Sequence, residues 1–251
     1  MRQIHPPDAG GREPDLPALY AYPGEAQTAG QPWVRANMIA SADGAAEVDG
    51  LSGGLSGSAD REVFGLLRAL ADVIMVGAGT ARDERYLPAR PQPRWAALRR
   101  GAAAAPAIAV LTGRLDLDIT APLLTQAPAD ARTIVITTAA APEHRRAQAA
   151  KHAEVIVAGE DRVDPAAAIA ALARRGHRRI LAEGGPHLLG QLAEQGLLDE
   201  LCVTISPVLA AGSAGRIIQG RPQPSGPSQL TLAHVLEDQG YLLCRYLRQR
   251  S

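Results

Sequence analysis

Short apolar runs rich in β-branched residues alternate with helix-like segments along most of this chain. Such alternation is typical of an α/β domain with a largely parallel sheet, because each crossover helix lets the next strand start in the same direction. The runs that we interpret as strands are Trp33–Ser41, Asp72–Gly77, Ala107–Leu111, Thr133–Thr137, Val155–Val157, Arg179–Ala182 and Glu200–Ile205. Two further runs, Gln229–Leu236 and Tyr241–Leu247, predict an antiparallel hairpin that turns at Asp238–Gly240.

One helix can be placed by its periodicity. Leu66, Leu67 and Leu70 recur at the spacing of a single buried stripe, and Ser58 or Asp60 is expected to cap the N-terminus of this helix. Further helices are expected at Pro142–His152, at Pro165–Arg175 and after His187 up to about Gln195.

Charge and composition exclude several classes of protein. The 251 residues hold 26 basic and 26 acidic side chains, and this neutral balance argues against a nucleic-acid partner. No apolar run approaches the roughly 20 residues that a membrane-spanning helix needs, so no membrane association is expected. The two cysteines, Cys202 and Cys244, lie inside apolar runs, which favours a reduced cytoplasmic protein over a disulfide scaffold.

Residues 1–31 differ from the rest of the chain because they are rich in proline and glycine. They lack the basic start and the apolar stretch of a secretory signal. We therefore expect a poorly ordered or loosely docked arm over residues 1–31, followed by one domain over residues 32–251.

Two predicted strands end in glycines. The first ends in Val76-Gly-Ala-Gly-Thr80, where Gly77 and Gly79 allow a ligand to approach the backbone closely. The second leads through Glu183 into Gly184-Gly-Pro-His187 at the start of a helix. Unpaired N–H groups and the helix dipole make such a start suitable for phosphate or diphosphate. Glu183 is expected at the carboxyl edge of the sheet, where α/β proteins bind their ligands.

The glycine-rich loop between the first strand and the first helix is a third candidate. Hydroxyl groups of Ser52 and Ser56 could close over a polar ligand there. Asp60 either caps the following helix or grips the amidine-like edge of a heterocycle. No metal site is predicted, since the cysteine and histidine spacings of zinc sites are missing.

Several motifs occur together in a fixed order. They are Asn37-Met-Ile-Ala-Ser-Ala-Asp-Gly44, the Ser52 loop, Arg68, Asp72-Val-Ile-Met-Val-Gly-Ala-Gly-Thr80, Leu181-Ala-Glu-Gly-Gly-Pro186, Leu198-Asp-Glu-Leu201 and Ile205-Ser-Pro-Val-Leu209. This series resembles the reductase domain of the bifunctional riboflavin-biosynthesis deaminase/reductase. The resemblance implies the fold of dihydrofolate reductase, a three-layer α/β/α sandwich with a mostly parallel central sheet and a C-terminal antiparallel hairpin. It also implies an NADPH-dependent homodimer that reduces a ribosylamino-pyrimidine phosphate, as 5-amino-6-(5-phosphoribosylamino)uracil reductase does.

The resemblance carries over to individual residues. Arg114 is added on chemical grounds, because a guanidinium pairs with the 2′-phosphate that distinguishes NADPH. The residues expected at the cofactor are Ala40, Gly77, Gly79, Thr80, Thr112, Arg114, Gly184, Gly185, Pro186, His187, Leu188 and Leu189. The residues expected at the substrate are Asn37, Ser52, Asp60, Arg68 and Glu183, with Asp60 as the catalytic candidate.

The chain also departs from the family pattern. Asn37 stands where the family commonly has lysine, and the usual Asp-Asp-Pro-x-Leu-Thr-x-Arg segment is shortened to Asp83-Glu-Arg-Tyr-Leu-Pro-Ala-Arg90. Glu84 and Arg90 therefore match only through a gap. Asp60 falls where dihydrofolate reductases carry their substrate-binding acid. A dihydrofolate or pterin reductase on the same scaffold, or a catalytically silent NADPH-binding protein, therefore stays open as an alternative.

Overall fold

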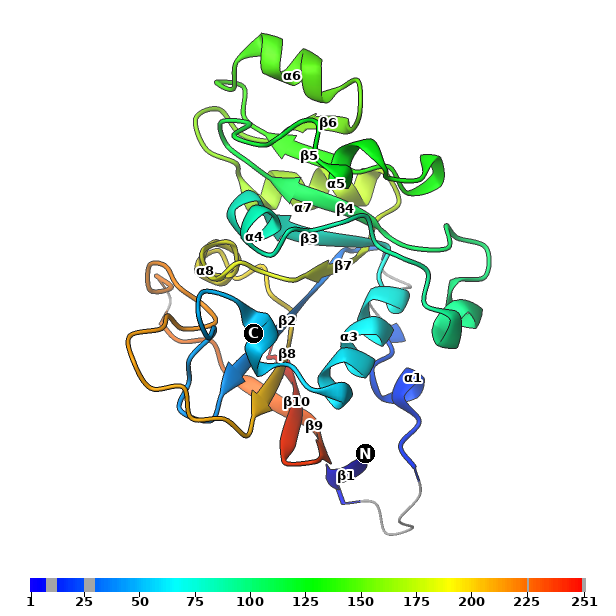
Figure 1. Cartoon of the computed structure of the whole chain (residues 1–251), viewed down its shortest axis with the longest axis vertical. Helices are drawn as coiled ribbons and strands as arrows, with labels where there is room; N and C mark the ends of the chain where they lie inside the picture. The colour runs from blue at the N-terminus through cyan, green and yellow to red at the C-terminus, as the bar shows by residue number, and fades with distance from the viewer. Residues whose placement is uncertain (8–12, 25–29, 225, 250–251) are drawn as a thin grey trace.

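The computed structural model describes residues 1–7, 13–24, 30–224 and 226–249 (Figure 1). Its strands are β1 (Arg2–His5), β2 (Trp33–Ser41), β3 (Val73–Gly77), β4 (Ala107–Leu111), β5 (Ile134–Thr137), β6 (Glu154–Val157), β7 (Arg179–Ala182), β8 (Glu200–Ser206), β9 (Leu230–Asp238) and β10 (Tyr241–Arg248). Its helices are α1 (Leu16–Leu19), α3 (Ser58–Leu70), α4 (Ala78–Asp83), α5 (Pro122–Thr125), α6 (Glu143–Ala149), α7 (Pro165–Arg174) and α8 (Pro186–Glu194). Short 3-10 turns are η1 (Ser52–Leu55), η2 (Pro93–Arg99) and η3 (Ala129–Ala131).

All described strands join one sheet in the order β1-β9-β10-β8-β2-β7-β3-β4-β5-β6. Neighbouring strands from β8 through β6 run parallel, whereas β10 runs antiparallel to both β8 and β9. In Figure 1 the sheet extends from β1 near the bottom to β6 near the top. The predicted hairpin is confirmed, and Gln239 and Gly240 turn it with φ of 51° and 84°.

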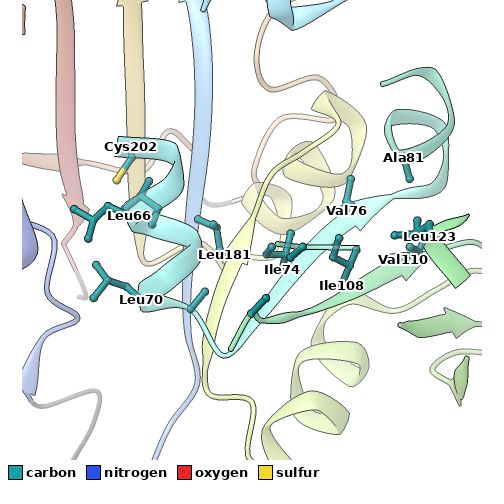
Figure 2. Close-up of a cluster of buried hydrophobic side chains, with 14 of the residues drawn as sticks. Leu66, Leu70, Ile74, Val76, Ala81, Ile108, Val110, Leu123, Leu181 and Cys202 are labelled. Atoms are coloured by element: carbon teal, nitrogen blue, oxygen red, sulfur yellow. The ribbon is translucent and has the colours of Figure 1, made fainter. Parts of the chain in front are cut away.

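Helices cover both faces of the parallel part of the sheet. Successive side chains of a strand point to opposite faces, so Ile74 and Val76 of β3 join one core cluster while Val73 and Met75 join the other. The first cluster includes side chains from α1, α3, α4, α5 and α6, and the second includes those of α7 and α8. Figure 2 shows the first cluster, with Leu66 of α3 beside the sheet. The predicted three-layer α/β/α architecture is confirmed.

The N-terminus of α3 differs from the prediction. Gly57 is the N-cap residue and no side chain caps the helix, so neither Ser58 nor Asp60 has the predicted capping role. Asp60 lies in the first turn instead, where it accepts a hydrogen bond of 2.6 Å from the Ser56 hydroxyl. The helix dipole favours an ionised carboxylate at this position.

Two described parts of residues 1–31 contact the rest of the fold, while the expected division into an arm and a domain stays a prediction. Strand β1 pairs antiparallel with β9, and the side chains of Leu16, Tyr20 and Tyr22 are buried. This docking could not be predicted, because a few apolar residues among prolines and glycines show no periodicity. Residues 8–12 and 25–29 of this segment lie outside the described residues.

A buried ion cluster lies beneath the docked segment. Glu200 of β8 forms an ion pair with Arg35 of β2 (Nε–Oε1 2.6 Å) and accepts a hydrogen bond from Nε of Arg245 of β10 over 2.7 Å. The same arginines donate to backbone carbonyl groups of residues 19–21. Burial alone would raise the pKa of Glu200, but the two guanidinium charges outweigh it and hold this pKa below its usual value. The cluster therefore joins three adjacent strands to the N-terminal segment.

His234 should make the stability of the fold depend on pH. Its side chain is 2% exposed beside the ring of Tyr20, and burial together with the charge of Arg245 lowers its pKa to about 4. Below pH 6.5 this histidine binds a proton in the unfolded chain but stays neutral in the native state, so the free energy of unfolding falls as the pH decreases. We expect a loss of about 2 kcal/mol between pH 7.5 and pH 5 in urea unfolding. His234→Phe should remove this part of the pH dependence, and an unchanged slope would contradict the assignment.

The described residues contain no membrane-spanning helix, no cluster of metal-binding side chains and no disulfide. None of their helices has both the length and the apolar character needed to cross a bilayer. Within the same residues, no group of three or more metal-binding side chains gathers at one place. Both cysteines are free and buried.

Candidate active site

Two glycine-containing turns meet at the carboxyl edge of the sheet. The backbone N–H of Gly77, after β3, donates to the carbonyl of Gly184, after β7, over 2.9 Å. A Cβ atom added to Gly185 would overlap the hydroxyl oxygen of Thr80, so the two turns approach as closely as a missing side chain allows. The contact follows from the sheet order, because β3 and β7 are parallel neighbours whose carboxyl ends lie at the same edge.

The start of α8 supplies hydrogen-bond donors at this edge. Gly185 is the N-cap residue, no side chain caps the helix, and Pro186 occupies the first turn. The N–H groups of His187 and Leu188 are therefore free of a side-chain cap. Gly184 has a φ of 97°, a backbone conformation that glycine adopts readily, and its peptide bond to Gly185 is cis. These donors, together with the helix dipole, fit the diphosphate of a dinucleotide.

The β3–α4 turn differs from its sequence interpretation in one respect. Thr80 lies within the short helix α4, which starts directly after Gly77. Gly79 faces open space, since nothing would lie within 4 Å of a Cβ atom at this position. Thr112 follows β4 at the same edge and is buried, whereas Arg114 is exposed two residues later. The edge therefore holds the expected cofactor residues of β3, β4 and β7 on adjacent strands.

Arg68 and Glu183 contact each other directly. Two hydrogen bonds of 2.7 Å join the guanidinium Nε and Nη2 to the two carboxylate oxygens. Tyr86 donates a third hydrogen bond of 2.8 Å to Oε2 of Glu183. The Glu183 side chain is 1% exposed and the Arg68 side chain 20%. The structure thus brings together two residues that the sequence predicts at the substrate, although they lie 115 positions apart.

The remaining substrate candidates lie on neighbouring elements. Ser52 of η1 donates from both its backbone N–H and its hydroxyl to Oε1 of Glu84, each over 2.9 Å. Asp60 is 9% exposed on α3. Asn37 is half-buried in β2, on the same side of that strand as Arg35, and Ala40 is buried near the end of the strand.

Two residues that the sequence did not assign to the substrate side belong to this arrangement. Glu84 matched the family pattern only through a gap, and Tyr86 matched none of it. Their partners Ser52 and Glu183 are 32 and 97 residues away, which no local periodicity can reveal. The shortened segment around them was the available signal.

A cavity of about 280 Å³ lies beside this edge, between the loops that follow β2 and β8. Its lining residues are Glu47, Val48, Asp49, Gly50, Ala210, Ala211, Ser213 and Ala214. Asp43 fastens the two loops by accepting from the N–H groups of Ala210 and Ala211. Its hydrogen bonds, first that from the Ser41 hydroxyl and then those from the two backbone N–H groups, lower the pKa of Asp43 to about 2. None of the site residues named individually from the sequence lines this cavity, although Glu47, Val48, Asp49 and Gly50 belong to the glycine-rich candidate loop.

The fold and this edge define a class of protein, an α/β reductase domain of the dihydrofolate-reductase-like type that uses a nicotinamide cofactor. A family model described as the RibD C-terminal domain matches residues 32–243. The chain belongs to this family.

Named relatives agree with the family. The chain is 34% identical over 185 residues to the 2,5-diamino-6-ribosylamino-4(3H)-pyrimidinone 5′-phosphate reductase of Archaeoglobus fulgidus, covering 72% of this chain and 83% of that protein. It is 30% identical over 190 residues to the protein of the same name from Methanothermobacter thermautotrophicus, covering 75% and 83%. The crystal structure of a pyrimidine reductase-like protein from Corynebacterium diphtheriae superposes with a TM-score of 0.83 at 28% identity, covering 94% and 99%.

Proposed function

We propose that this chain is an NADPH-dependent reductase of a 5′-phosphorylated ribosylamino-pyrimidine in riboflavin biosynthesis. The observation that carries the proposal is the position of Glu183, directly after β7 and two residues before Gly185, the N-cap of α8. A side chain that we assign to the substrate therefore lies within five positions of the His187 and Leu188 N–H groups that we assign to the diphosphate. The names of the relatives support the substrate class, since the archaeal proteins are reductases of such a pyrimidine.

The cofactor supplies a hydride when it is bound, and the protein supplies position and electrostatics. N–H groups of His187 and Leu188 would hold the diphosphate, with the hydroxyl groups of Thr80 and Thr112 on either side. Arg114, exposed after β4, would pair with the 2′-phosphate. This pairing is the reason for proposing NADPH over NADH.

On the substrate side, the Arg68–Glu183 pair and Ser52 lie on different elements of the same edge. Asp60 would hold or transfer the proton that accompanies reduction, either directly or through an ordered water molecule. Its proximity to Ser56 fixes the carboxylate within the first turn of α3.

The decisive experiment follows NADPH oxidation by purified protein under four conditions, three acceptors and a control. These are the 2,5-diamino ribosylamino-pyrimidinone phosphate, the corresponding 5-amino uracil, dihydrofolate, and no acceptor. We expect turnover with a ribosylamino-pyrimidine phosphate. Turnover with dihydrofolate alone, reduced by Asp60→Asn, would establish the folate alternative. NADPH binding without any turnover would indicate a catalytically silent protein.

Arg114→Ala should raise the KM for NADPH about tenfold and change the KM for NADH little.

We also propose that the protein is a cytoplasmic homodimer. Val203 and Ile205 of β8 and Leu242 and Tyr246 of β10 are only partly buried, lie on two paired strands with Ile205 opposite Leu242, and are outside both core clusters. An apolar patch of neighbouring side chains is unusual on a monomer and suits a second copy of the same face. The free buried cysteines support a reducing compartment.

The dimer proposal predicts the effect of one substitution. Val203→Glu should convert the dimer to a monomer in size-exclusion chromatography with light scattering, because it places a charge in an apolar interface. Val157→Glu on β6 is the matched control, since Val157 is 50% exposed at the opposite edge of the sheet. A monomeric wild type, or a dimeric Val203→Glu variant, would contradict the proposal.

A further inference from the structure

The segment Glu84–Tyr86 connects two sides of the candidate active site. It follows α4, and the Tyr86 N–H closes the end of this helix by donating to the Ala81 carbonyl over 2.8 Å. Glu84 reaches Ser52 in η1, and Tyr86 reaches Glu183 after β7. Arg85 between them has a φ of 51°, in the left-handed region, which reverses the direction of the chain. Neighbouring residues thus contact elements that come from distant parts of the sequence.

Aromatic rings enclose the guanidinium of Arg68. Its Cζ lies 4.3 Å from the ring centre of Phe64 and 5.6 Å from that of Tyr86. Phe64 is the single phenylalanine in 251 residues. Cation–π contacts of this kind restrain a guanidinium whose hydrogen-bonding groups are already engaged. Arg68 is therefore held by its faces as well as by Glu183.

Most hydrogen-bonding atoms of Arg68, Glu183 and Tyr86 are already engaged with one another. The Glu183 carboxylate accepts from Nε and Nη2 of Arg68 and from the Tyr86 hydroxyl. Within the described residues, Arg68 makes no hydrogen bond through Nη1. A substrate that reaches Arg68 therefore meets the Nη1 group of a guanidinium whose position is fixed by its pairing with Glu183.

We propose that Tyr86 is a positioning residue for substrate recognition, because its hydroxyl and its ring together fix the Arg68–Glu183 pair at the carboxyl end of β7. The inference rests on the proposed function and extends it to a residue outside the family pattern. The family segment Asp-Asp-Pro-x-Leu-Thr-x-Arg leaves the position of Tyr86 unspecified, so the pattern itself assigns no role to this residue.

The state of the tyrosine is consistent with this role. Burial, followed by the negative charge of Glu183, raises the pKa of Tyr86 well above its usual value. The hydroxyl group thus remains a donor throughout the pH range in which enzymes of this kind are assayed.

The test compares Tyr86→Phe with Tyr246→Phe in the full chain. Tyr86→Phe keeps the ring beside Arg68 and removes the hydrogen bond to Glu183. We expect the KM for the ribosylamino-pyrimidine phosphate to rise about tenfold, as the loss of a hydrogen bond to a charged group would cause. The Kd for NADPH, measured by fluorescence, should stay within about twofold, because Tyr86 touches no group assigned to the diphosphate. Tyr246→Phe, which removes a hydroxyl from β10 opposite Leu201 near the start of β8, should change neither constant.

Each outcome decides the inference. An active wild type with an unchanged KM in Tyr86→Phe would overturn it and leave the proposed function intact. Equal losses in KM and in NADPH affinity would show a general structural role and would also overturn it. A wild type without turnover of any ribosylamino-pyrimidine phosphate would overturn the proposed function and this inference with it.

Discussion

Replacing Glu200 with Gln is expected to destabilise the fold by about 3–5 kcal/mol, because it leaves two buried guanidinium groups without a counter-charge. Arg35 is 0% exposed and Arg245 is 7% exposed, so neither can turn to water without opening the sheet. Glutamine has nearly the same shape as glutamate, so the effect reports the charge rather than a cavity. In the variant, Nε1 of Trp33 would still donate to the side chain at position 200. Backbone carbonyl groups of the N-terminal segment would still accept from the two arginines.

Urea unfolding of the wild type and the variant at pH 7.5 measures this effect. The matched control is Glu154→Gln, which breaks an ion pair with Arg175 whose two side chains are 37% and 43% exposed. Exposed pairs contribute below about 1 kcal/mol, so this control should unfold close to the wild type. A change below 1 kcal/mol in Glu200→Gln would show that the buried cluster is not a major source of stability. Should that variant be too unstable to purify, Arg245→Met, which removes one of the two cations, offers a milder perturbation of the same cluster.

Adding one methyl group at Gly185 is expected to weaken NADPH binding at least tenfold. The new Cβ would overlap Oγ1 of Thr80, so the Thr80 hydroxyl must rotate away or the β7–α8 turn must separate from the β3–α4 turn. Separation of the turns would displace the N–H groups of His187 and Leu188 that we assign to the diphosphate. Equilibrium binding followed by nucleotide fluorescence measures the loss directly.

Two comparisons isolate the cause. Gly65→Ala lies inside α3, where the added Cβ meets Gln92 at 3.4 Å or more, so it should bind NADPH normally and stabilise the helix by about 0.5–1 kcal/mol. The Gly185→Ala change should also cost less affinity in a Thr80→Ala background, since the overlapping atom is gone. Equal costs in both backgrounds would show that contact with Thr80 is not the reason for the loss.

The pattern of apolar runs and turn residues predicted most of the central sheet. β3 was found because both of its faces are buried, which makes Val73–Val76 a continuous apolar run. The hairpin was found because two strand-like runs flank a short turn that contains Gly240. β1 was missed, since its four residues are mostly exposed and show no alternation.

The candidate site was predicted in part for the same reason. Glycines that end a strand and begin a helix are local signals, and Gly184 and Gly185 lie where they were expected. The prediction for Arg68 was incomplete, because its bidentate partner Glu183 is remote in the sequence. Arg35 gave no signal at all, since one charged residue within a strand-like run usually faces solvent.

The sequence by itself determined the strands from β2 to β10, the helices α3, α6, α7 and α8, and the two glycine turns, because hydrophobic periodicity and glycine conformation act over a few residues. Only the tertiary structure decided which charges meet. Glu200 pairs with Arg35 and Arg245 because β8 lies between β2 and β10, and Tyr86 reaches Glu183 because β3 and β7 are neighbours. These partners are separated by 45 to 165 residues, and their proximity follows from the order of strands in the sheet, which no local pattern specifies.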